Sequence, residues 1–520
     1  MSLKSFHRSF SRKINCMISC FVNHLNFRFI HLVYAIFIAT SCLEASSNLI
    51  EIHKKGVLHR FVHFDPATDH FTQNIFPNWE NDTFDAFALV NDQEGIAIDL
   101  GAWIGTTSIW LAKNFHHVIA VEPDRESLKC LRMNLEASDC TNVTICEKPV
   151  EQMRRDVIFG PRGSVLNESI SYLKTNSDSS LDYTTKSITF KQLVHDTVHA
   201  NEKLASRKIT FVKCDIEGGE ETILEDVLHF AYYNKCPVHM SFHLDWWKTK
   251  KITDFDYLFK YFDVKNTSIE NITEFLQAHP FASLLLVPKK NMGDLIKQNL
   301  TAVIIGYNQH TYIKNMVSQL EKYTKDIVII DNCSNYQPLL DYYQNEFKYS
   351  LFRQKKNFGH TIYLENWVRN FTGDIFILTD PDLQFNPQLP NNFIQELIDI
   401  SNHYRAERVG FALLINSPDM RTDIRHGIHT VYEWEKKFWE HRLYDYQRNR
   451  SLILYDAEVD TTSCLYNRNY IGVKHIRVAG NFTCKHIPWH LSFKENFTPD
   501  EYESYVKDNI SSNWFKPNYP

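Results

Sequence analysis

The sequence lacks the cysteine pattern that binds zinc or builds a disulfide framework. None of its eleven cysteines forms a Cys-x-x-Cys pair, so neither kind of site is indicated. The net charge is −6 and no long lysine-arginine run follows the N-terminal segment, which argues against nucleic acid as a partner. Internal repeats are also missing. What remains is a globular composition in 520 residues, a length that predicts two or three domains.

Residues 1–48 are expected to form a basic leader with a targeting segment. The first 28 residues contain no acid, and the apolar run Phe29–Cys42 follows them. This run is shorter than the roughly 20 residues of a membrane-spanning helix, so it resembles a signal peptide or a short signal anchor. We therefore expect the secretory pathway or membrane anchoring. The alternative is a disordered basic leader on a cytoplasmic protein.

The segment from Ile96 to Gly105 has the pattern of a buried parallel strand followed by a glycine turn. Gly101 and Gly105 let the backbone turn tightly and approach a ligand. Asp99 lies at the tip of the strand. Glu122 ends the next strand, 23 residues after Asp99, where a carboxylate can accept both hydroxyls of a ribose. The pattern predicts a cradle for a cofactor that contains a nucleoside.

Charge favours S-adenosylmethionine over a dinucleotide in this cradle. The dinucleotide pattern is Gly-x-Gly-x-x-Gly, and this turn has two of those glycines. Asp99 would repel a pyrophosphate, whereas it would attract the sulfonium and ammonium groups of adenosylmethionine. Two alternatives remain. The domain could belong to a nicotinamide-dependent oxidoreductase, or it could be a doubly wound domain that binds no ligand.

A second acidic turn follows the predicted strand Ile209–Lys213, and it contains Asp215, Glu217 and Glu220. Ligands of open α/β sheets bind beyond the carboxyl ends of the strands, so Asp215 should face the same crevice as Asp99. The three blocks Ile98–Gly105, Val121–Pro123 and Lys213–Glu220 resemble those of FkbM-type methyltransferases, over roughly residues 85–245. The resemblance implies a class I methyltransferase fold and O-methyl transfer, often to sugars or polyketide-like hydroxyls.

Methylation of a hydroxyl needs an acceptor for its proton. Asp215 and Glu217 are candidates for the base or for orienting the substrate. Glu220 is better explained as a carboxylate in the first turn of a helix, where the helix dipole favours it. His243 lies in the next predicted strand, and it is either a base or a half-buried strand histidine.

A domain boundary is expected near Pro288–Gly293, after the apolar strand Ser283–Val287. It separates a methyltransferase-like domain over residues 50–290 from a second domain over residues 297–515. Both have the pattern of α/β, Rossmann-like open sheets.

The second domain is expected to contain the strands Ala302–Gly306, Ile327–Asp331 and Asp374–Thr379, with a helix through Met316 and Tyr323. Asp380 and Asp382 follow the last of these strands. Two carboxylates at a buried strand tip repel each other, and a divalent cation with its preference for oxygen ligands removes that repulsion. Such a cation can stabilise a nucleotide diphosphate as a leaving group. A solvated Asp-Pro-Asp turn is the alternative.

With Asp331 and Asn357–Gly359, this pair resembles the inverting, family-2-like glycosyltransferases of the GT-A fold. The resemblance implies that Asp331 contacts the base of a nucleotide sugar and that Asp380 and Asp382 bind Mn²⁺ or Mg²⁺. By the same analogy His486 would be a third metal ligand, with a core histidine as the alternative.

Asp460 or Glu435 could deprotonate the acceptor hydroxyl. Glu435 is the weaker candidate, because Tyr432, Phe438 and Trp439 lie near it at helical spacing, and an aromatic helix face usually packs in a core.

These features together predict a bifunctional enzyme that modifies a glycan, glycolipid or glycoprotein. The first domain would transfer a methyl group from S-adenosylmethionine, and the second would transfer a sugar from a nucleotide donor with Mn²⁺ or Mg²⁺. The main alternative is an active methyltransferase whose C-terminal domain has lost catalysis and binds glycans.

Overall fold

The computed structural model describes residues 49–161, 171–174, 177, 180, 182–290, 295, 299–426, 428–446, 449, 451–492 and 497–507. The leader expected over residues 1–48 lies outside this range, as do residues 508–515 of the expected second domain. Within the described range, helices long and apolar enough to span a membrane are absent.

The chain forms two compact units. The described part of the first unit comprises residues 49–79 and 132–141. It contains a hairpin and two short helices: β1 (Leu49–Lys54), β2 (Val57–Val62), α3 (Pro66–His70) and the π-helix η1 (Phe71–Ile75). The ammonium group of Lys54 is buried and donates to the carbonyl oxygens of Phe76 (3.1 Å) and Trp79 (2.5 Å). It thereby ties the hairpin to the segment after η1.

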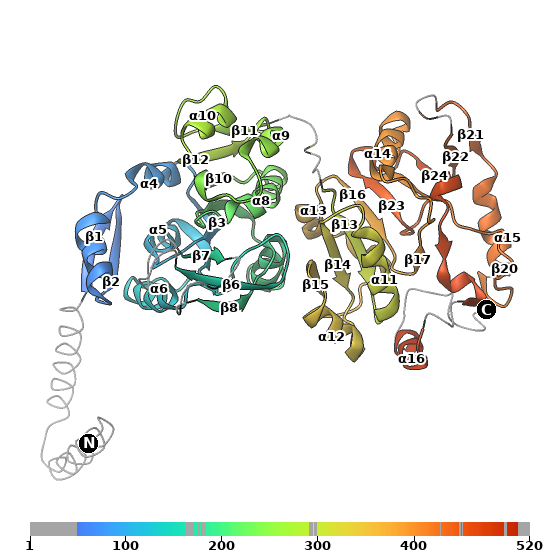
Figure 1. Ribbon diagram of the computed structural model, residues 1–520, viewed down its shortest axis with the longest axis horizontal. Helices are drawn as coiled ribbons and strands as arrows, with labels where there is room; N and C mark the ends of the chain where they lie inside the picture. The colour runs from blue at the N-terminus through green and yellow to red at the C-terminus, as the bar shows by residue number, and fades with distance from the viewer. Residues whose placement is uncertain are drawn as a thin grey trace, which may run out of the picture. The chain divides into compact units, whose positions relative to one another are not determined.

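The second unit contains two large mixed sheets (Figure 1). The first sheet has the strand order β11-β12-β10-β9-β3-β4-β5, in which β10, β9, β3, β4 and β5 are parallel and β12 is antiparallel to both of its neighbours. Its strands are β3 (Asp92–Leu100), β4 (Phe115–Val121), β5 (Val143–Cys146), β9 (Ile209–Cys214), β10 (Val238–His243), β11 (Phe262–Val264) and β12 (Phe281–Pro288).

Helices alternate with these strands, and a small antiparallel sheet follows β5. The helices are α4 (Asn81–Ala88), α5 (Thr106–Asn114), α6 (Arg125–Ala137), α7 (Phe190–Val194), η2 (His195–His199), α8 (Glu220–Asn234), η3 (Leu244–Trp246), η4 (Ile252–Phe255), α9 (Asp256–Phe259) and α10 (Ile272–Ala278). The small sheet comprises β6 (Asp156–Pro161), β7 (Ser171–Lys174) and β8 (Tyr183–Lys186).

The second sheet has the strand order β15-β14-β13-β16-β23-β18-β24-β22-β21. Its strands are β13 (Ala302–Gly306), β14 (Ile327–Asp331), β15 (Ser350–Arg353), β16 (Ile375–Thr379), β18 (Arg408–Phe411), β21 (Arg442–Leu443), β22 (Ile453–Asp456), β23 (Cys464–Asn467) and β24 (His475–Ala479). The first four strands are parallel, and β23 joins them in the antiparallel direction.

The second sheet is accompanied by helices and by two short strand pairs. The helices are α11 (His310–Leu320), α12 (Gln337–Asn345), η5 (His360–Leu364), α13 (Asn366–Thr372), α14 (Phe393–Tyr404), α15 (Val431–Lys436), η6 (Lys437–Trp439), η7 (Arg468–Tyr470), η8 (Gly480–Phe482), η9 (Ile487–Trp489) and α16 (Pro499–Lys507). The pairs are β17 (Leu383–Gln384) with β25 (Lys485–His486), and β19 (Arg425–His426) with β20 (His429–Thr430).

One hydrophobic core extends from the first sheet to one face of the second. It includes Phe190 of α7 and Phe230 of α8 together with Val303 of β13 and Phe376 of β16. The His195 ring stacks on Phe352 of β15, with centroids 4.5 Å apart. The opposite face of the second sheet has a separate core with α11 and α14. The first domain's helices thus cover a face that the second sheet would otherwise expose.

The predicted α/β class with two Rossmann-like sheets is confirmed. The apolar runs predicted as strands from Ile96, Ile209, Ala302 and Ile327 all form strands. The helix expected to continue through Tyr323 ends at Leu320 instead. The chain passes from one sheet to the other between β12 and β13, and the domain limits 50–290 and 297–515 stay predictions.

Candidate active sites

The glycine turn after β3 packs closely against the end of β9. Gly101 has a φ of +80°, and a Cβ atom there would lie 1.8 Å from the carbonyl oxygen of Asp215. Gly105 is also left-handed, with a φ of +95°, and a Cβ atom there would lie 3.0 Å from Leu131 Cδ1. Glycine is therefore required at Gly101 both by conformation and by the close backbone approach.

Asp99 is fully buried, and its carboxylate is used inside the fold. It accepts hydrogen bonds from the hydroxyls of Thr107 (2.8 Å) and Ser108 (2.6 Å), and Lys213 Nζ lies 3.1 Å from it. Burial lowers the pKa of Lys213, but the charges of Asp99 and Asp215 outweigh burial and raise it. The ammonium group of Lys213 thus compensates the charge of Asp99, and a role of Asp99 in attracting a cationic cofactor stays a prediction.

Glu122 lies where it was predicted, at the end of β4 beside the glycine turn. One carboxylate oxygen accepts a hydrogen bond from the backbone N–H of Trp103, and the other accepts one from that of Asp124, each at 2.7 Å. Burial raises the pKa of Glu122 to about 8. Each carboxylate oxygen has a second lone pair, so the group can still accept a pair of hydroxyls.

Four ionisable side chains meet where β9 and β10 end. His243 Nε2 lies 3.7 Å from Asp215 Oδ1 and 3.6 Å from Glu217 Oε2, while His243 Nδ1 lies 3.1 Å from Glu220 Oε1. Glu220 is fully buried, and it also accepts hydrogen bonds from the backbone N–H groups of Ile216 and Gly218, each at 2.9 Å. Glu220 thus fixes both the acidic turn and the histidine ring, which is more than the first-turn role that was expected of it.

The charges of this cluster decide the protonation of His243. Burial lowers its pKa, but the hydrogen bond and charge of Glu220 and the charges of Asp215 and Glu217 outweigh burial and raise it to about 9. The imidazole is therefore protonated at neutral pH. A protonated ring cannot accept a proton, which leaves Asp215 and Glu217 as the better bases.

Glu80 is a further carboxyl group at this edge that the motifs missed. It precedes α4 in the left-handed conformation, with a φ of 44°. Burial and the charge of Asp215 raise its pKa to about 7. A group with a pKa near neutrality suits general acid-base catalysis. No motif surrounds Glu80 in the sequence, so its proximity to Asp215 could be found only from the fold.

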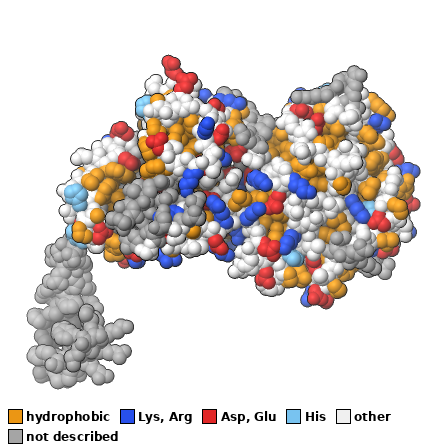
Figure 2. All heavy atoms as spheres, in the orientation of Figure 1, with side chains coloured by type: hydrophobic (Ala, Val, Ile, Leu, Met, Phe, Trp, Pro, Cys, Tyr) orange, Lys and Arg blue, Asp and Glu red, His pale blue; other side chains and the backbone are white. Residues whose placement is uncertain are grey.

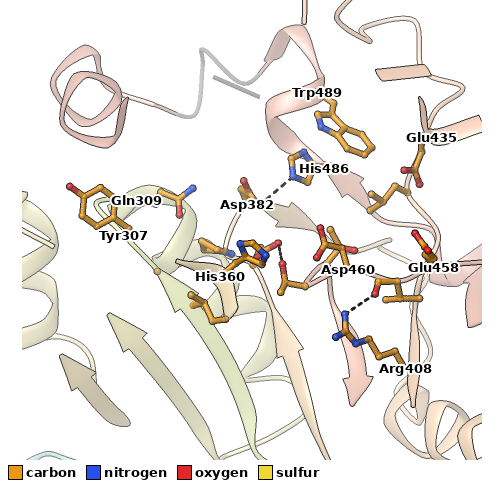
Figure 3. Close-up of a pocket in the computed structure, with 18 of the residues that line it drawn as sticks. Tyr307, Gln309, His360, Asp382, Arg408, Glu435, Glu458, Asp460, His486 and Trp489 are labelled. Carbon is orange, nitrogen blue, oxygen red and sulfur yellow. Dashed lines mark hydrogen bonds and ion pairs between the residues drawn. The ribbon is translucent and has the colours of Figure 1, made fainter. Parts of the chain in front are cut away.

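A cavity of about 460 Å³ opens where β13 and β16 end (Figure 3). The aromatic side chains of Trp434, Phe438 and Trp489 line part of its wall. The acidic, arginine and histidine residues that line it are His360, Asp380, Asp382, Arg408, Glu435, Glu458, Asp460, His475, Arg477 and His486.

Asp380 and Asp382 lie in this wall, and strand pairing brings His486 to them. Leu383 of β17 pairs with His486 of β25, and His486 Nε2 lies 3.7 Å from Asp382 Oδ1. Asp380 accepts a hydrogen bond from the Thr461 hydroxyl at 2.8 Å. Burial raises the pKa of Asp380 well above its usual value, with a further contribution from Asp382, and burial raises that of Asp382 to about 7. Burial lowers the pKa of His486 to about 3.

Two polar atoms of this group have no hydrogen-bond partner among the described residues. They are Asp382 Oδ1 and His486 Nδ1, and both residues are buried. Burying a polar atom without a partner costs free energy, and a cation would remove that cost at Asp382 Oδ1. The chemistry of the donor set fits a divalent metal ion. The three predicted ligands are more widely spread than the cluster at the first sheet, whose ligand atoms lie within 4.8 Å of one another.

Asp331 does not line the cavity, although the resemblance implied a contact with the nucleotide base. It is fully buried and accepts hydrogen bonds from Ser334 and from the Tyr343 hydroxyl (3.2 Å). Arg353 Nε lies 3.4 Å from it. This carboxylate stabilises the turn after β14, and its neighbour Asn332 reaches the cavity. A contact of Asp331 with the nucleotide base stays a prediction.

Asp460 and Glu435 differ in how free they are to act as a base. Asp460 is exposed in the cavity wall and faces the same hollow as Asp382 and His486 (Figure 3). Glu435 is buried and bound to Arg477. Burial raises the pKa of Glu435 to about 7, against the charge of Arg477. Asp460 is thus more accessible than Glu435, and its role as the base stays a prediction.

Family comparisons match the two sheets to two kinds of transferase. The model of the methyltransferase FkbM domain matches residues 99–277, and that of glycosyl transferase family 2 matches residues 301–471. The chain joins an FkbM methyltransferase domain to a family 2 glycosyltransferase domain. The resemblances drawn from the sequence motifs are confirmed for both halves, while His486 lies beyond the matched residues.

Solved structures show a weaker likeness. The methyltransferase FkbM from Methylobacillus flagellatus KT is 15% identical, with a TM-score of 0.24 over 38% of this chain and 44% of that one. An rRNA methylase from Streptococcus thermophilus is 14% identical, with a TM-score of 0.24 over 39% and 92%. A precorrin-6y C5,15-methyltransferase from Geobacter metallireducens GS-15 is 12% identical, with a TM-score of 0.22 over 41% and 90%. A comparison with curated proteins gave no match.

Several residues that line the cavity of the glycosyltransferase domain were not predicted from the sequence. Arg408 lines it and donates to the carbonyl oxygen of Val459 (2.9 Å) and to the Tyr363 hydroxyl (2.8 Å). His360 and His475 also line it. These residues belong to no motif, so the sequence carried no signal for them.

The aromatic helix face expected near Glu435 is not a core. Tyr432 is 44% exposed, and Phe438 lines the cavity with Trp434. The expectation that helical spacing indicates burial fails here, because α15 lies at the edge of the glycosyltransferase cavity rather than under the sheet.

Proposed function

We propose that the protein is a bifunctional glycan-modifying enzyme. Its methyltransferase domain uses S-adenosylmethionine to methylate an oxygen, and its glycosyltransferase domain transfers a sugar from a nucleotide donor with Mn²⁺ or Mg²⁺. One observation carries this proposal: each sheet places carboxylates at its carboxyl edge, within a match to the corresponding transferase family. The acceptor is a glycan, glycolipid or glycoprotein, and a secretory or membrane-anchored location stays an expectation from the sequence.

The methyl-donor site is supported by the free lone pairs of Glu122 and by the glycine turn beside it. When bound, adenosylmethionine supplies an electrophilic methyl group. Asp215 and Glu217 then accept the proton of the acceptor hydroxyl, while His243 orients these two carboxylates from its fixed position on Glu220. Lys213 holds the ends of β3 and β9 together through Asp99 and the Gly101 carbonyl oxygen (2.6 Å).

The sugar-donor site is supported by the unpartnered oxygen of Asp382 and by the position of His486. When bound, a divalent cation supplies positive charge for a diphosphate leaving group. Asp380, Asp382 and His486 would hold it, with Asp380 oriented by the Thr461 hydroxyl. Asp460 takes the proton from the acceptor hydroxyl in a single in-line displacement.

A donor screen tests this function. Full-length protein is incubated with adenosylmethionine, individual nucleotide sugars, Mn²⁺ and a glycan library, and the products are analysed by mass spectrometry. We expect products with an added sugar, an added methyl group or both. A D380A/D382A variant should lose sugar transfer and keep methyl transfer. Absence of nucleotide-sugar turnover in the wild type would instead favour a glycan-binding C-terminal domain.

A further inference from the structure

The acidic turn after β9 has the residue types of a metal site. Asp215, Glu217 and His243 each offer one ligand atom, and these atoms all lie within 4.8 Å of one another. In the described part of the chain, this is the one group of three or more His, Cys, Asp or Glu residues that meets this condition. All three are partly accessible, with side-chain exposures between 14% and 18%.

The distances fit ligands around a cation better than direct hydrogen bonds. His243 Nε2 lies 3.7 Å from Asp215 Oδ1 and 3.6 Å from Glu217 Oε2, beyond the usual range of N–H···O bonds. Two ligands that are each about 2.1 Å from one cation are separated by this much when the angle between them is roughly 120°. The three atoms therefore leave space for an ion between them.

The His243 ring is oriented by a buried carboxylate, in the same way as many histidines that bind metals. Its Nδ1 atom donates to Glu220 (3.1 Å), whose carboxylate is fully buried and fixed by two backbone N–H groups. A histidine ligand commonly donates its second ring N–H to a carboxylate, which fixes its orientation and leaves the other nitrogen for the metal. The ring also stacks on Trp246, with an interplanar angle of 3°. Nε2 is thus directed at the two carboxylates.

We propose that Asp215, Glu217 and His243 bind one divalent cation of the Mn²⁺ or Mg²⁺ class on the acceptor side of the methyl-transfer site. The inference rests on the proposed methyltransferase function. The two carboxylates suit either cation, and the imidazole nitrogen favours Mn²⁺ over Mg²⁺. The bound cation replaces the proton on His243 Nε2. A hydroxyl of the acceptor that binds this cation loses its proton more readily.

When the cation is bound, Asp215 and Glu217 are its ligands and no longer serve as the base. The acceptor hydroxyl then passes its proton to solvent water. The oxygen forms a bond to the methyl carbon, the carbon–sulfur bond of the sulfonium donor breaks, and the electron pair stays on sulfur as a neutral thioether. The acceptor class is therefore a molecule with a hydroxyl and a neighbouring oxygen that can both reach a cation, such as a sugar diol.

Electron paramagnetic resonance on the full chain tests the cation site. MnCl₂ is the only metal salt added, and the number of bound Mn²⁺ ions per chain is measured. The background variant D380N/D382N removes the ligands proposed for the glycosyltransferase domain. In this background, we expect one Mn²⁺ per chain, with a ¹⁴N coupling from His243. E217Q or H243F should weaken binding at least tenfold, and H243F should abolish the coupling. H279Q is the matched control, because His279 is an exposed histidine whose ring faces its own helix at Phe275.

Calorimetric titration with adenosylmethionine on the same samples reports whether the fold and the methyl-donor site are intact. Retention of Mn²⁺ by both E217Q and H243F, or loss of all Mn²⁺ in the D380N/D382N background, would overturn the proposed cation site. Mn²⁺ binding without adenosylmethionine binding would support the cation site and overturn the proposed methyltransferase function. The two failures are thus distinguishable.

Discussion

At the scale of single residues, burial sets the chemistry of both sites. Glu122 and Asp382 are buried carboxyl groups whose pKa values rise to about 8 and about 7. Asp99 is also buried, but Lys213 compensates its charge. A buried carboxyl group is therefore available to a ligand at one position and stabilises the fold at another, depending on its partners.

The raised pKa of Glu122, about 8, predicts pH-dependent binding of the methyl donor. Ribose hydroxyls donate to the ionised carboxylate, so affinity is full above pH 8 and falls as pH drops through 8, by up to about tenfold per pH unit. E122Q should bind about 1.5–3 kcal/mol more weakly at pH 9 and lose the pH dependence. Calorimetry from pH 6 to 9 measures both effects.

The control for this variant is E126Q. Glu126 lies near Glu122 in the chain, but pairs with Lys129 on α6, so its variant should bind as the wild type does. A pH-independent affinity of the wild type would contradict the assigned role of Glu122.

The base of sugar transfer is predicted to be Asp460. D460N should lower the rate of transfer by about 10²–10⁴-fold and leave binding of the nucleotide sugar unchanged, because general-base catalysis contributes that much. Glu458 supplies a matched comparison, since it is another exposed carboxylate in the same wall. If E458Q, and not D460N, abolishes transfer in a kinetic assay, the assignment of the base is wrong.

At the scale of elements, the strand register brings together site residues that the sequence could identify only one at a time. The apolar runs placed Asp99, Glu122 and Asp215 at strand ends, as the pattern of open α/β sheets predicts. The pairing of Asp99 with Lys213 depends on the β3–β9 register, and the approach of His486 to Asp382 depends on the β17–β25 pair. These relations join segments far apart in the chain, so local patterns could not show them.

The glycine turn after β3 is predicted to tolerate no side chain. The G101A substitution places a Cβ atom 1.8 Å from the Asp215 carbonyl oxygen. This clash comes on top of the strain of a positive φ at a residue with a side chain. Gly472 has a similar φ of +73°, with no atom within 4 Å of its Cβ position. G472A should therefore lower the free energy of unfolding by about 1–2 kcal/mol, and G101A by clearly more, as measured by urea denaturation. Equal losses would show that the β3 and β9 turns are not in close contact.

At the scale of the whole molecule, the methyltransferase and glycosyltransferase sheets belong to one compact unit. Lys191 of α7 forms a buried ion pair with Asp326, which precedes β14, at 2.5 Å, and donates to the Thr301 hydroxyl at 3.1 Å. Basic and acidic side chains are interspersed on the face shown in Figure 2, which accords with the small net charge of −6. The hydrophobic core and ion pairs such as Lys191 with Asp326 therefore hold the second unit together.

Breaking the Lys191 pair is predicted to destabilise both domains together. K191M leaves the partly buried carboxylate of Asp326 without its charged partner, a change that costs about 1–3 kcal/mol. Scanning calorimetry should show one transition for the second unit, shifted to lower temperature. The exposed pair of Lys355 with Glu202 also joins the two domains, and K355M should leave the transition unchanged. Two separate transitions in the wild type would contradict a common core.

The most direct test of two independent transferase sites is a pair of calorimetric titrations of the full chain, one with S-adenosylmethionine and one with nucleotide sugar and Mn²⁺. The wild type should bind both ligands. E122Q should weaken binding of the methyl donor alone, and D382N should weaken binding of the sugar donor alone. Failure of the folded wild type to bind either ligand, or loss of both by one folded variant, would contradict the presence of two independent transferase sites.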